Sequence, residues 1–323
     1  MQSANPPLES SGARRGRGTF YNALMSRLRS GAVEPSHTRG GVLRVGCVSF
    51  LNARPLIDGL VDDGGERTID LKLNVPSGLL ADLEQGSADV ALCPVIDYYR
   101  SRTPLVILPT GGIASRGQTM TVKLYSRVPI EEIKTVYADT DSHTSVALLQ
   151  VVLARTYNIR PAIIDFNARE QTAERRIVDD PPTVLLIGDK VVTAAPNETD
   201  YPYQLDLGEA WAAQTGLPFV FAVWMARRGV DLGPVPRLLE ARRADNVGRI
   251  DRIVADHAEA HGWPRDLAVR YLGQLLHYEI GPTQLEAIEL FAAKAYELGL
   301  IDAPRPLCVR GGGVADSVKI VAP

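Results

Sequence analysis

From residue 43 onward, short apolar runs alternate with stretches of helical periodicity. Residues 43–48, 70–75 and 88–94 form apolar or alternating runs that predict three strands. A helix is expected to start near Pro55, and a second one at residues 77–85, capped by Ser77 and ended by a glycine. This alternation predicts a parallel sheet with right-handed crossovers.

The middle of the chain repeats this alternation. We expect a helix at residues 145–157 and strands at residues 135–138, 162–165, 183–187 and 203–207. Two β-rich stretches, 119–126 and 219–227, bracket this section. We interpret it as a second α/β domain inserted into the first, with the bracketing stretches as crossover strands. The last part is predicted to be helical, at residues 238–259, 264–276 and 282–298.

These elements predict an α/β fold of two lobes, the clamshell of type II periplasmic-binding-protein-like proteins, with a ligand cleft between the lobes. A further strand is expected at residues 105–108 and a glycine-containing loop at 111–117. We expect the first lobe at residues 41–124 and 225–310, the second at 125–224, and flexible segments at 1–40 and 311–323.

The first 40 residues differ in charge from the rest of the chain. Six arginines and two glutamates give this segment a net charge of +4, which leaves −7 for the remainder of a chain whose total is −3. We expect a flexible extension, because its few apolar groups cannot offset the entropy of ordering. A signal peptide would need an apolar core, and an arm for nucleic acid or a membrane would need more charges. The acidic body argues against a nucleic-acid partner.

The loop after the first strand carries the first group of candidate site residues. Ser49, Asn52 and Arg54 supply a hydroxyl, a neutral amide and a fixed cation. These groups suit the binding of an anionic small molecule better than proton transfer. The alternative is that Asn52 caps the helix near Pro55 and Arg54 is solvated.

The second group opens the helix expected from residue 145. Ser142, His143, Thr144 and Ser145 place hydroxyls and free backbone amides at a helix N-terminus, where the dipole favours an anion. One hydroxyl, of Ser142 or Thr144, is expected to cap the helix. His143 is either a ligand donor or an exposed cap residue.

Three further positions are weaker candidates for the site. Ser115 lies in the glycine-containing loop before the first crossover strand, and Thr121 follows it. Asp189 follows the strand at residues 183–187, where it could contact a ligand, bridge the closed lobes or form an ordinary turn. His257 and His261 lie one helical turn apart, but the order of a His-Glu-x-x-His zinc motif is missing, so we expect no metal.

The three cysteines are far apart in the sequence and form no Cys-x-x-Cys pair. Cys47 and Cys93 lie in apolar strands, so buried, inert thiols are expected. No apolar run approaches the roughly 18 residues of a membrane span, and we expect a soluble, cytoplasmic protein.

Five strings together resemble the chorismate dehydratase family of the futalosine route to menaquinone. They are VSFLNARPL, VPSGLLADLEQGSADVALCPVIDYYR, SHTSVALLQ, LIGDKVV and DLGEAWAAQTGLPFVFAVW, in family order from residue 43 to residue 301. The resemblance implies a two-lobed fold and conversion of chorismate to 3-[(1-carboxyvinyl)oxy]benzoate and water without metal or organic cofactor. Two departures stand out: His143 replaces a usual arginine, and residues 117–122 differ from the usual pattern.

The resemblance implies roles for the candidate residues. Asn52 and Ser49 would orient the substrate, whose own enolpyruvyl carboxylate would remove the proton, since an amide accepts no proton at neutral pH. Substrate contacts would come from Arg54, Ser77, Ser115, Thr121, the helix start at Ser142, His143, Thr144 and Ser145, and Asp189. We expect chorismate as the small-molecule partner, neither nucleic acid nor membrane, and a monomer or homodimer.

Three other interpretations stay open at this point. The first is a non-catalytic small-anion binding protein of the same fold that serves a transporter. The second is the effector domain of a transcription regulator, although no helix-turn-helix is evident. The third is a related enzyme that acts on a cyclic futalosine intermediate.

Overall fold

The computed structural model describes residues 42–61, 69–166 and 181–311. Residues 38–323 form one compact unit, and the other unit, residues 1–37, lies outside the described residues. The expected basic extension and most of the expected C-terminal tail therefore also lie outside them.

A six-stranded sheet forms the first lobe, in the order β11-β4-β10-β3-β1-β2. As expected, β1 pairs in parallel with both β2 and β3. The later strand β10 runs antiparallel to β3 and β4. Its strands are β1 (Leu43–Val48), β2 (Ile69–Asn74), β3 (Val90–Pro94), β4 (Leu105–Ser115), β10 (Phe219–Arg227) and β11 (Leu276–His277).

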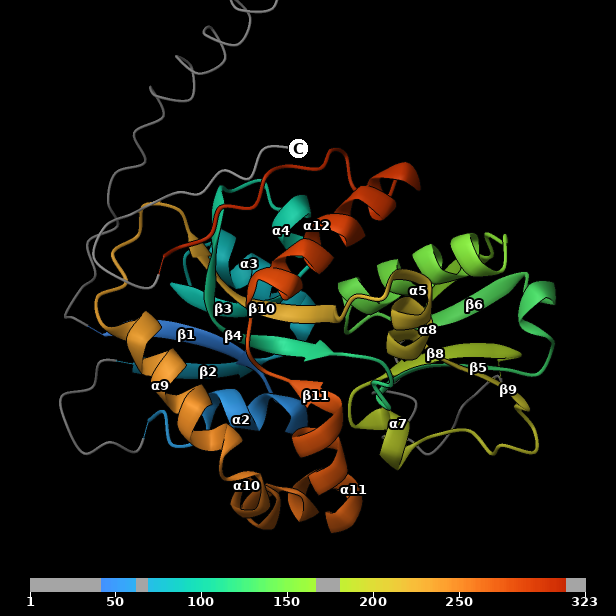
Figure 1. Ribbon diagram of the computed structural model, residues 1–323, viewed down its shortest axis with the longest axis horizontal. Helices are drawn as coiled ribbons and strands as arrows, with labels where there is room; N and C mark the ends of the chain where they lie inside the picture. Colours follow the sequence, from blue (N-terminus) through green and yellow to red (C-terminus); the bar gives the residue numbers. More distant parts are fainter. Residues whose placement is uncertain (1–41, 62–68, 167–180, 312–323) are drawn as a thin grey trace, which may run out of the picture. The chain divides into compact units, whose positions relative to one another are not determined.

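Helices cover both faces of this sheet. In Figure 1, α2 and α9 lie on one face and α3, α4 and α12 on the other. The helices of this lobe are η1 (Leu51–Ala53), α2 (Arg54–Ile57), η2 (Pro76–Gly78), α3 (Leu79–Glu84), α4 (Asp97–Arg100), α9 (Val235–Val247), α10 (Ile250–His257), η4 (Glu259–His261), α11 (Arg265–Arg270), the π-helix η5 (Tyr271–Leu275) and α12 (Pro282–Glu297).

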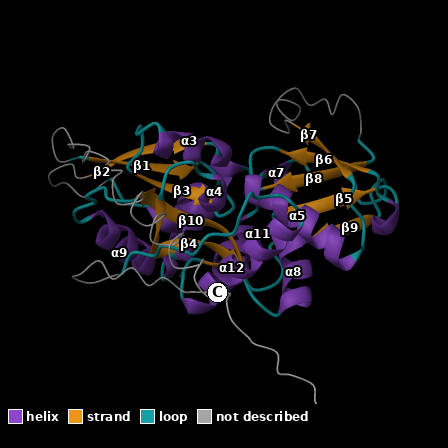
Figure 2. Ribbon diagram, turned by 90° about the horizontal axis from the view of Figure 1, so that it is seen from above, coloured by secondary structure: helices purple, strands orange, loops and turns teal. Residues whose placement is uncertain are grey.

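A five-stranded sheet in the order β7-β6-β8-β5-β9 forms the second lobe (Figure 2). Its elements are β5 (Val122–Ser126), η3 (Ile130–Glu132), β6 (Thr135–Asp139), α5 (His143–Thr156), β7 (Ala162–Phe166), β8 (Thr183–Ile187), α7 (Lys190–Thr193), β9 (Tyr203–Asp206) and α8 (Leu207–Thr215). Each of the four strands expected in this section is present.

The chain passes between the two lobes twice, before β5 and before β10. Each flanking strand belongs to one sheet: β5 to the sheet of the second lobe and β10 to the sheet of the first lobe. Neither strand is shared between the lobes, whereas the sequence interpretation treated both as crossover strands. The expected boundaries at 124/125 and 224/225 fall inside these two strands. We therefore place the lobe boundaries at 116–121 and 216–218.

The first of these passages is a strained turn held by a carboxylate. Met120 has a φ of 71°, a conformation that costs a residue with a side chain free energy. Asp206 accepts hydrogen bonds from the backbone amides of Thr119 at 2.9 Å and Met120 at 2.6 Å. The same carboxylate caps α8 through the amides of Gly208 and Glu209. One side chain therefore fixes both the turn and the helix that leads back to the first lobe.

A T-shaped aromatic cluster joins α8 to the first lobe. The ring of Trp211 lies 5.3 Å from that of Phe219 and 6.0 Å from that of Phe291, centroid to centroid. Trp211, Phe219 and Trp224 are buried in the core, and Phe221 lies in the wall of the cleft described below.

Two expectations about local structure were wrong. The expected glycine loop at residues 111–117 is strand up to Ser115, because Gly112 lets β4 approach β10: a Cβ at Gly112 would lie 2.6 Å from the carbonyl oxygen of Ala222. The expected helix at residues 238–259 is two helices, α9 and α10, separated at Gly248.

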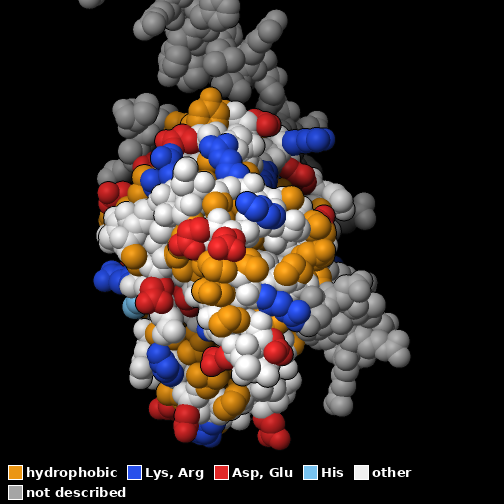
Figure 3. Space-filling model, turned by 90° about the vertical axis from the view of Figure 1, so that its right-hand side faces the viewer, with side chains coloured by type: hydrophobic (Ala, Val, Ile, Leu, Met, Phe, Trp, Pro, Cys, Tyr) orange, Lys and Arg blue, Asp and Glu red, His pale blue; other side chains and the backbone are white. Residues whose placement is uncertain are grey.

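Among the described residues, none of the helices combines the length and hydropathy that crossing a bilayer requires. Figure 3 shows one face of the molecule, on which acidic, basic and apolar side chains are interspersed. The described part of that face therefore lacks the continuous basic stripe typical of nucleic-acid binding.

Candidate functional site

A cleft of about 520 Å³, including its open mouth, lies between the two lobes. The ends of β1 and β3 border it from the first lobe, and β5, β8 and the start of α5 border it from the second. It is lined by Val48, Phe50, Asn52, Pro76, Pro94, Ile113, Thr119, Thr121, Val122, Ser142, Ser145, Ile187, Gly188, Phe221, Ala222, Tyr271 and Leu276. None of these described lining residues is charged, so an anion bound here would depend on amides, hydroxyls and the helix dipole.

Asn52 reaches this cleft from the short helix that follows β1. Its Nδ2 donates to the hydroxyl of Tyr271 at 3.3 Å, and its Oδ1 is buried without a partner among the described residues. The alternative that Asn52 caps the next helix is wrong, because the N-cap of α2 is Ala53 and no side chain caps it. A buried acceptor without a partner costs free energy, which a ligand donor would recover.

Tyr271 is the main site residue that the sequence interpretation missed. It lies at the start of the π-helix η5, is buried, and its hydroxyl lies 2.6 Å from Oγ1 of Thr121. Burial raises the pKa of the phenol, and the hydrogen bonds with Thr121 and Asn52 offset this only in part. The phenol is therefore protonated at neutral pH and acts as a hydrogen-bonding group.

The N-terminus of α5 supplies the second polar wall of the cleft. Ser142 is its N-cap, accepting from the backbone amide of Ser145 at 3.3 Å, with the two hydroxyl oxygens 3.0 Å apart. Both residues line the cleft. The expectation that one of the two hydroxyls of Ser142 and Thr144 caps the helix is confirmed for Ser142.

The other two residues of this helix start face the first lobe instead of the cleft. Thr144 accepts a hydrogen bond from the amide of Ile96 at 3.2 Å, and Nδ1 of His143 lies 2.8 Å from Oδ1 of Asp97. Neither lines the cleft. These contacts join α5 to the segment after β3 and so hold the two lobes together.

Asp189 also joins the lobes. Its Oδ2 accepts from the amide of Leu51 at 3.3 Å and lies 2.8 Å from Nδ1 of His261, and its Oδ1 accepts from Nε1 of Trp263 at 2.9 Å. Asp189 could contact a ligand, bridge the lobes or form an ordinary turn, and these contacts correspond to the bridge between the lobes. Its neighbour Gly188 lines the cleft, whereas Asp189 does not.

Four more candidates lie outside the cleft lining, namely Ser49, Arg54, Ser77 and Ser115. Ser115 bonds within its own turn, with Oγ 3.0 Å from Oγ1 of Thr119. The expected helix cap by Ser77 was wrong: Ser77 lies inside η2, and the N-cap of α3 is Gly78. The reason is the preceding proline, which starts the turn one residue earlier.

A buried lysine pairs with the two acidic residues that precede α5. Nζ of Lys190 lies 2.8 Å from Oδ2 of Asp141 and also contacts the carboxylate of Asp139. Burial raises the pKa of Asp139 despite the attraction of Lys190. The ammonium group offsets part of the negative charge of these two carboxylates.

The remaining candidates of the sequence have structural partners. Cys47 and Cys93 are fully buried, as expected, and burial raises the pKa of the Cys47 thiol to about 12. His257 lies 2.7 Å from Asp58, whereas His261 contacts Asp189. The two imidazoles therefore bind different carboxylates in different places.

Two α/β lobes with a cleft between them place this chain in the periplasmic-binding-protein fold class. It is similar to protein AF1704 from Archaeoglobus fulgidus, with a TM-score of 0.60 and 16% identity over 81% of this chain and 100% of that one. It is also similar to the periplasmic aliphatic sulphonate binding protein SsuA from Escherichia coli, with a TM-score of 0.56 and 16% identity over 81% of this chain and 94% of that one. At such identities the likeness shows the fold alone.

Sequence comparison identifies the family. The chain belongs to the menaquinone biosynthesis family, which it matches over residues 43–297. It is 30% identical over 249 residues to a chorismate dehydratase from Thermus thermophilus. The aligned region covers 71% of this chain and 87% of that protein. The fold class and the family resemblance expected from the sequence are thus confirmed.

Proposed function

We propose that this protein dehydrates chorismate to 3-[(1-carboxyvinyl)oxy]benzoate in menaquinone biosynthesis by the futalosine route. The reaction removes one proton from the ring carbon that bears the enolpyruvyl ether and the hydroxyl from the neighbouring carbon. These leave together as water, and the ring becomes aromatic. The relative from Thermus thermophilus, a chorismate dehydratase, supports this substrate.

The observation that carries the proposal is the cleft itself. An amide whose oxygen is buried, four serine and threonine hydroxyls, the phenol of Tyr271 and a capped helix N-terminus line it, among them Asn52, Thr121 and Ser142. Such groups bind carboxylates and a ring hydroxyl without titrating at neutral pH. The apolar remainder, which includes Phe50 and Phe221, suits the face of a six-membered ring.

The proton acceptor in this proposal is the substrate. None of the described residues that line the cleft is a carboxylate or a histidine, and the amide of Asn52 accepts no proton. The enolpyruvyl carboxylate of chorismate would take the proton, and Asn52 would orient this carboxylate through the second N–H of its amide, since the first is donated to Tyr271. Ser49, which does not line the cleft, has no role in this version of the mechanism.

Incubation of the purified protein with chorismate tests the proposal. The expected product is aromatic and lighter by one water in liquid chromatography with mass detection, with chelator present and no cofactor added. Asn52→Ala should lose most of the turnover. Intact chorismate with a thermal shift would identify a binding protein instead, and turnover of a cyclic futalosine intermediate would identify the related enzyme.

Location, assembly and the lack of a cofactor stay predictions. Cell fractionation tests the cytoplasmic location, and light scattering distinguishes a monomer from a homodimer.

A further inference from the structure

The hydroxyl of Tyr271 connects the two cleft residues Asn52 and Thr121. It accepts from Nδ2 of Asn52 at 3.3 Å and lies 2.6 Å from Oγ1 of Thr121. These three residues come from the helix after β1, the turn before β5 and the π-helix η5. One buried phenol therefore links three distant segments at the wall of the cleft.

In the structure the Asn52 amide faces Tyr271 with its donor end, and the phenol that accepts this bond has its own proton to donate to Thr121. An amide has one donor end and one acceptor end, and the donor end of Asn52 is turned toward Tyr271. The acceptor, Oδ1, is then left buried without a partner among the described residues, on a residue that lines the cleft. We propose that Tyr271 is a positioning residue that holds the Asn52 amide so that its carbonyl oxygen is presented to a hydroxyl group of the ligand.

The surroundings of Tyr271 hold its ring in place. The ring stacks on Trp263 with centroids 4.8 Å apart and an angle of 10° between the planes. Nε1 of Trp263 donates to Asp189, which also accepts from the amide of Leu51, the residue before Asn52. The ring that orients the amide and the backbone that carries it are thus tied to the same carboxylate.

The π-helix gives this arrangement a local cause. A π turn inserts an extra residue into a helix and is frequent at functional sites, because it shifts the side chains that follow. Here the π turn begins at Tyr271 itself, directly after α11. The position of Tyr271 in this irregular turn fits a positional role.

The inference rests on the proposed function and adds a selection rule to it. The two carboxylates of chorismate are ionised at neutral pH, so its ring hydroxyl is the group that can donate a hydrogen bond to Oδ1 of Asn52. A site with a fixed, buried acceptor rejects ligands that lack the donor, because the acceptor is then left unpaired.

A double-mutant cycle tests whether Tyr271 acts through Asn52. Tyr271→Phe keeps the ring on Trp263 and removes the hydroxyl. We expect kcat/KM for chorismate to fall roughly tenfold to a hundredfold. When Tyr271→Phe is added to Asn52→Ala, kcat/KM should fall by less than a further factor of about two. The matched control is Tyr278→Phe, which removes another buried hydroxyl of the same region, one without a partner among the described residues, and should leave kcat/KM unchanged.

Two outcomes would overturn the proposal. The first is a kcat/KM of Tyr271→Phe equal to that of the wild type. The second is a double variant whose loss in kcat/KM is the product of the losses of Tyr271→Phe and Asn52→Ala, because the two residues would then act independently. Thermal unfolding is measured for every variant. If Tyr271→Phe does not fold, Thr121→Val replaces it, since it removes the other partner of the phenol at nearly the same shape and should also lower kcat/KM.

A second readout does not depend on chorismate. In protein with isotope-labelled asparagine, the side-chain resonances of Asn52 are assigned by their loss in Asn52→Ala. Tyr271→Phe should shift these resonances and Tyr278→Phe should not. If the wild type leaves chorismate intact, the proposed function fails, and an unshifted Asn52 signal in Tyr271→Phe would separately refute the role of Tyr271.

Discussion

The carboxylate of Asp189 accepts a hydrogen bond from the indole of Trp263 at 2.9 Å, and this contact joins the two lobes. Asp189 follows β8 of the second sheet, whereas Trp263 lies between η4 and α11 of the first lobe. Contacts with the amide of Leu51 and with His261 share the same carboxylate. Together with the contacts of His143 and Thr144, this side chain outside the cleft lining holds the two lobes that form the cleft.

Asp189→Ala should therefore weaken both the fold and the site. The amide of Leu51 and the indole of Trp263 each lose a charged acceptor, and we expect the free energy of unfolding to fall by about 2–4 kcal/mol. The KM for chorismate should rise, because the lobes no longer share this contact. Urea unfolding and steady-state kinetics measure the two effects. Asp200→Ala, at an exposed position, is the control, and equal behaviour of the two variants would contradict the bridging role.

The sequence predicted the sheets and one wall of the site. Strand runs such as residues 43–48 and 183–187 carry enough buried apolar residues to be recognised by pattern, and Ser142 was found because helix caps depend on local chemistry. Tyr271 was missed because an aromatic residue in a helical stretch is indistinguishable from a core residue. Its role comes from a π turn and from partners roughly 150 and 220 positions away, which no local pattern encodes.

The same limit explains why several candidates lie outside the cleft. His143, Thr144 and Asp189 are polar residues at the right ends of helices and strands, so pattern alone predicts ligand contacts for them. In the structure they bind groups of the opposite lobe: Asp97, the amide of Ile96 and Trp263. In a two-lobed fold the residues that hold the lobes together and the residues that bind a ligand share these positions.

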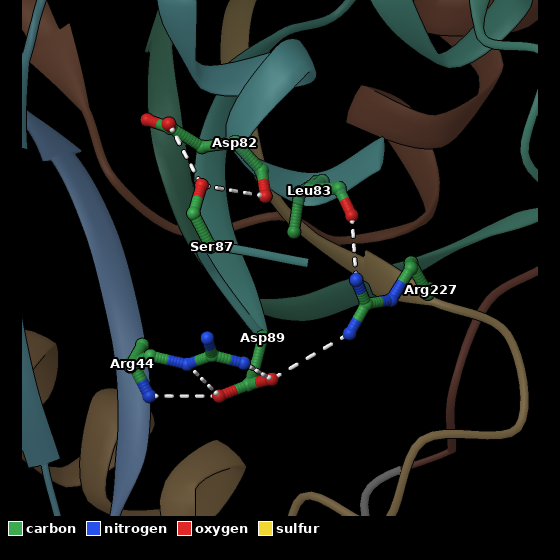
Figure 4. Close-up of polar contacts among 6 residues, drawn as sticks. All are labelled: Arg44, Asp82, Leu83, Ser87, Asp89 and Arg227. Atoms are coloured by element: carbon green, nitrogen blue, oxygen red, sulfur yellow. Dashed lines mark hydrogen bonds and ion pairs between the residues drawn. The ribbon is translucent and has the colours of Figure 1, made fainter. Parts of the chain in front are cut away.

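The ion pairs around Asp89 lie at the opposite end of the strands from the cleft. Figure 4 shows that Asp89 accepts from Arg44 through both carboxylate oxygens, with Arg227 close to the same group. Asp89 is buried, and Arg227 also donates to the carbonyl of Leu83 at 2.8 Å. Asp89→Asn should lower the free energy of unfolding by about 3 kcal/mol, because it leaves two guanidinium groups beside a neutral amide.

Activity separates this stability effect from a role in the site. At a temperature where Asp89→Asn is folded, its kcat/KM should lie within about twofold of the wild type. Arg249→Ala, which breaks an exposed pair with Asp245 one helical turn away, should change the free energy of unfolding by less than about 0.5 kcal/mol. Similar losses in the two variants would show that burial does not decide the strength of these pairs.

His277 links stability to pH. Burial, and then the positive charge of Arg116, lower the pKa of His277 below its ordinary value of 6.5. Between the folded pKa and 6.5 the unfolded chain binds more protons, so stability rises with pH there. The contribution of His277 is therefore complete above about pH 6.5 and is lost as the pH falls through the folded pKa.

Comparison with a variant isolates this contribution. From about pH 7.5 to about pH 5.5, the wild type should lose more free energy of unfolding than His277→Gln, whose side chain does not titrate. The other histidines are present in both proteins, so their effects cancel in the difference. Arg116→Gln should give an intermediate loss, because it removes the second cause of the shift. Identical pH dependence of wild type and His277→Gln would rule out the linkage.

Ser142 allows the helix cap to be separated from ligand binding. Ser142→Ala removes the acceptor for the amide of Ser145 and should cost about 1 kcal/mol of the free energy of unfolding. Ser142→Asp should restore that stability, because aspartate caps helices well and its charge suits the helix dipole. In the cleft, however, the same charge repels a dianion, so KM should rise further in Ser142→Asp than in Ser142→Ala. Urea unfolding and kinetics on both variants give the two readouts. A wild-type KM in the stable Ser142→Asp variant would mean that the start of α5 does not contact the carboxylates of the substrate.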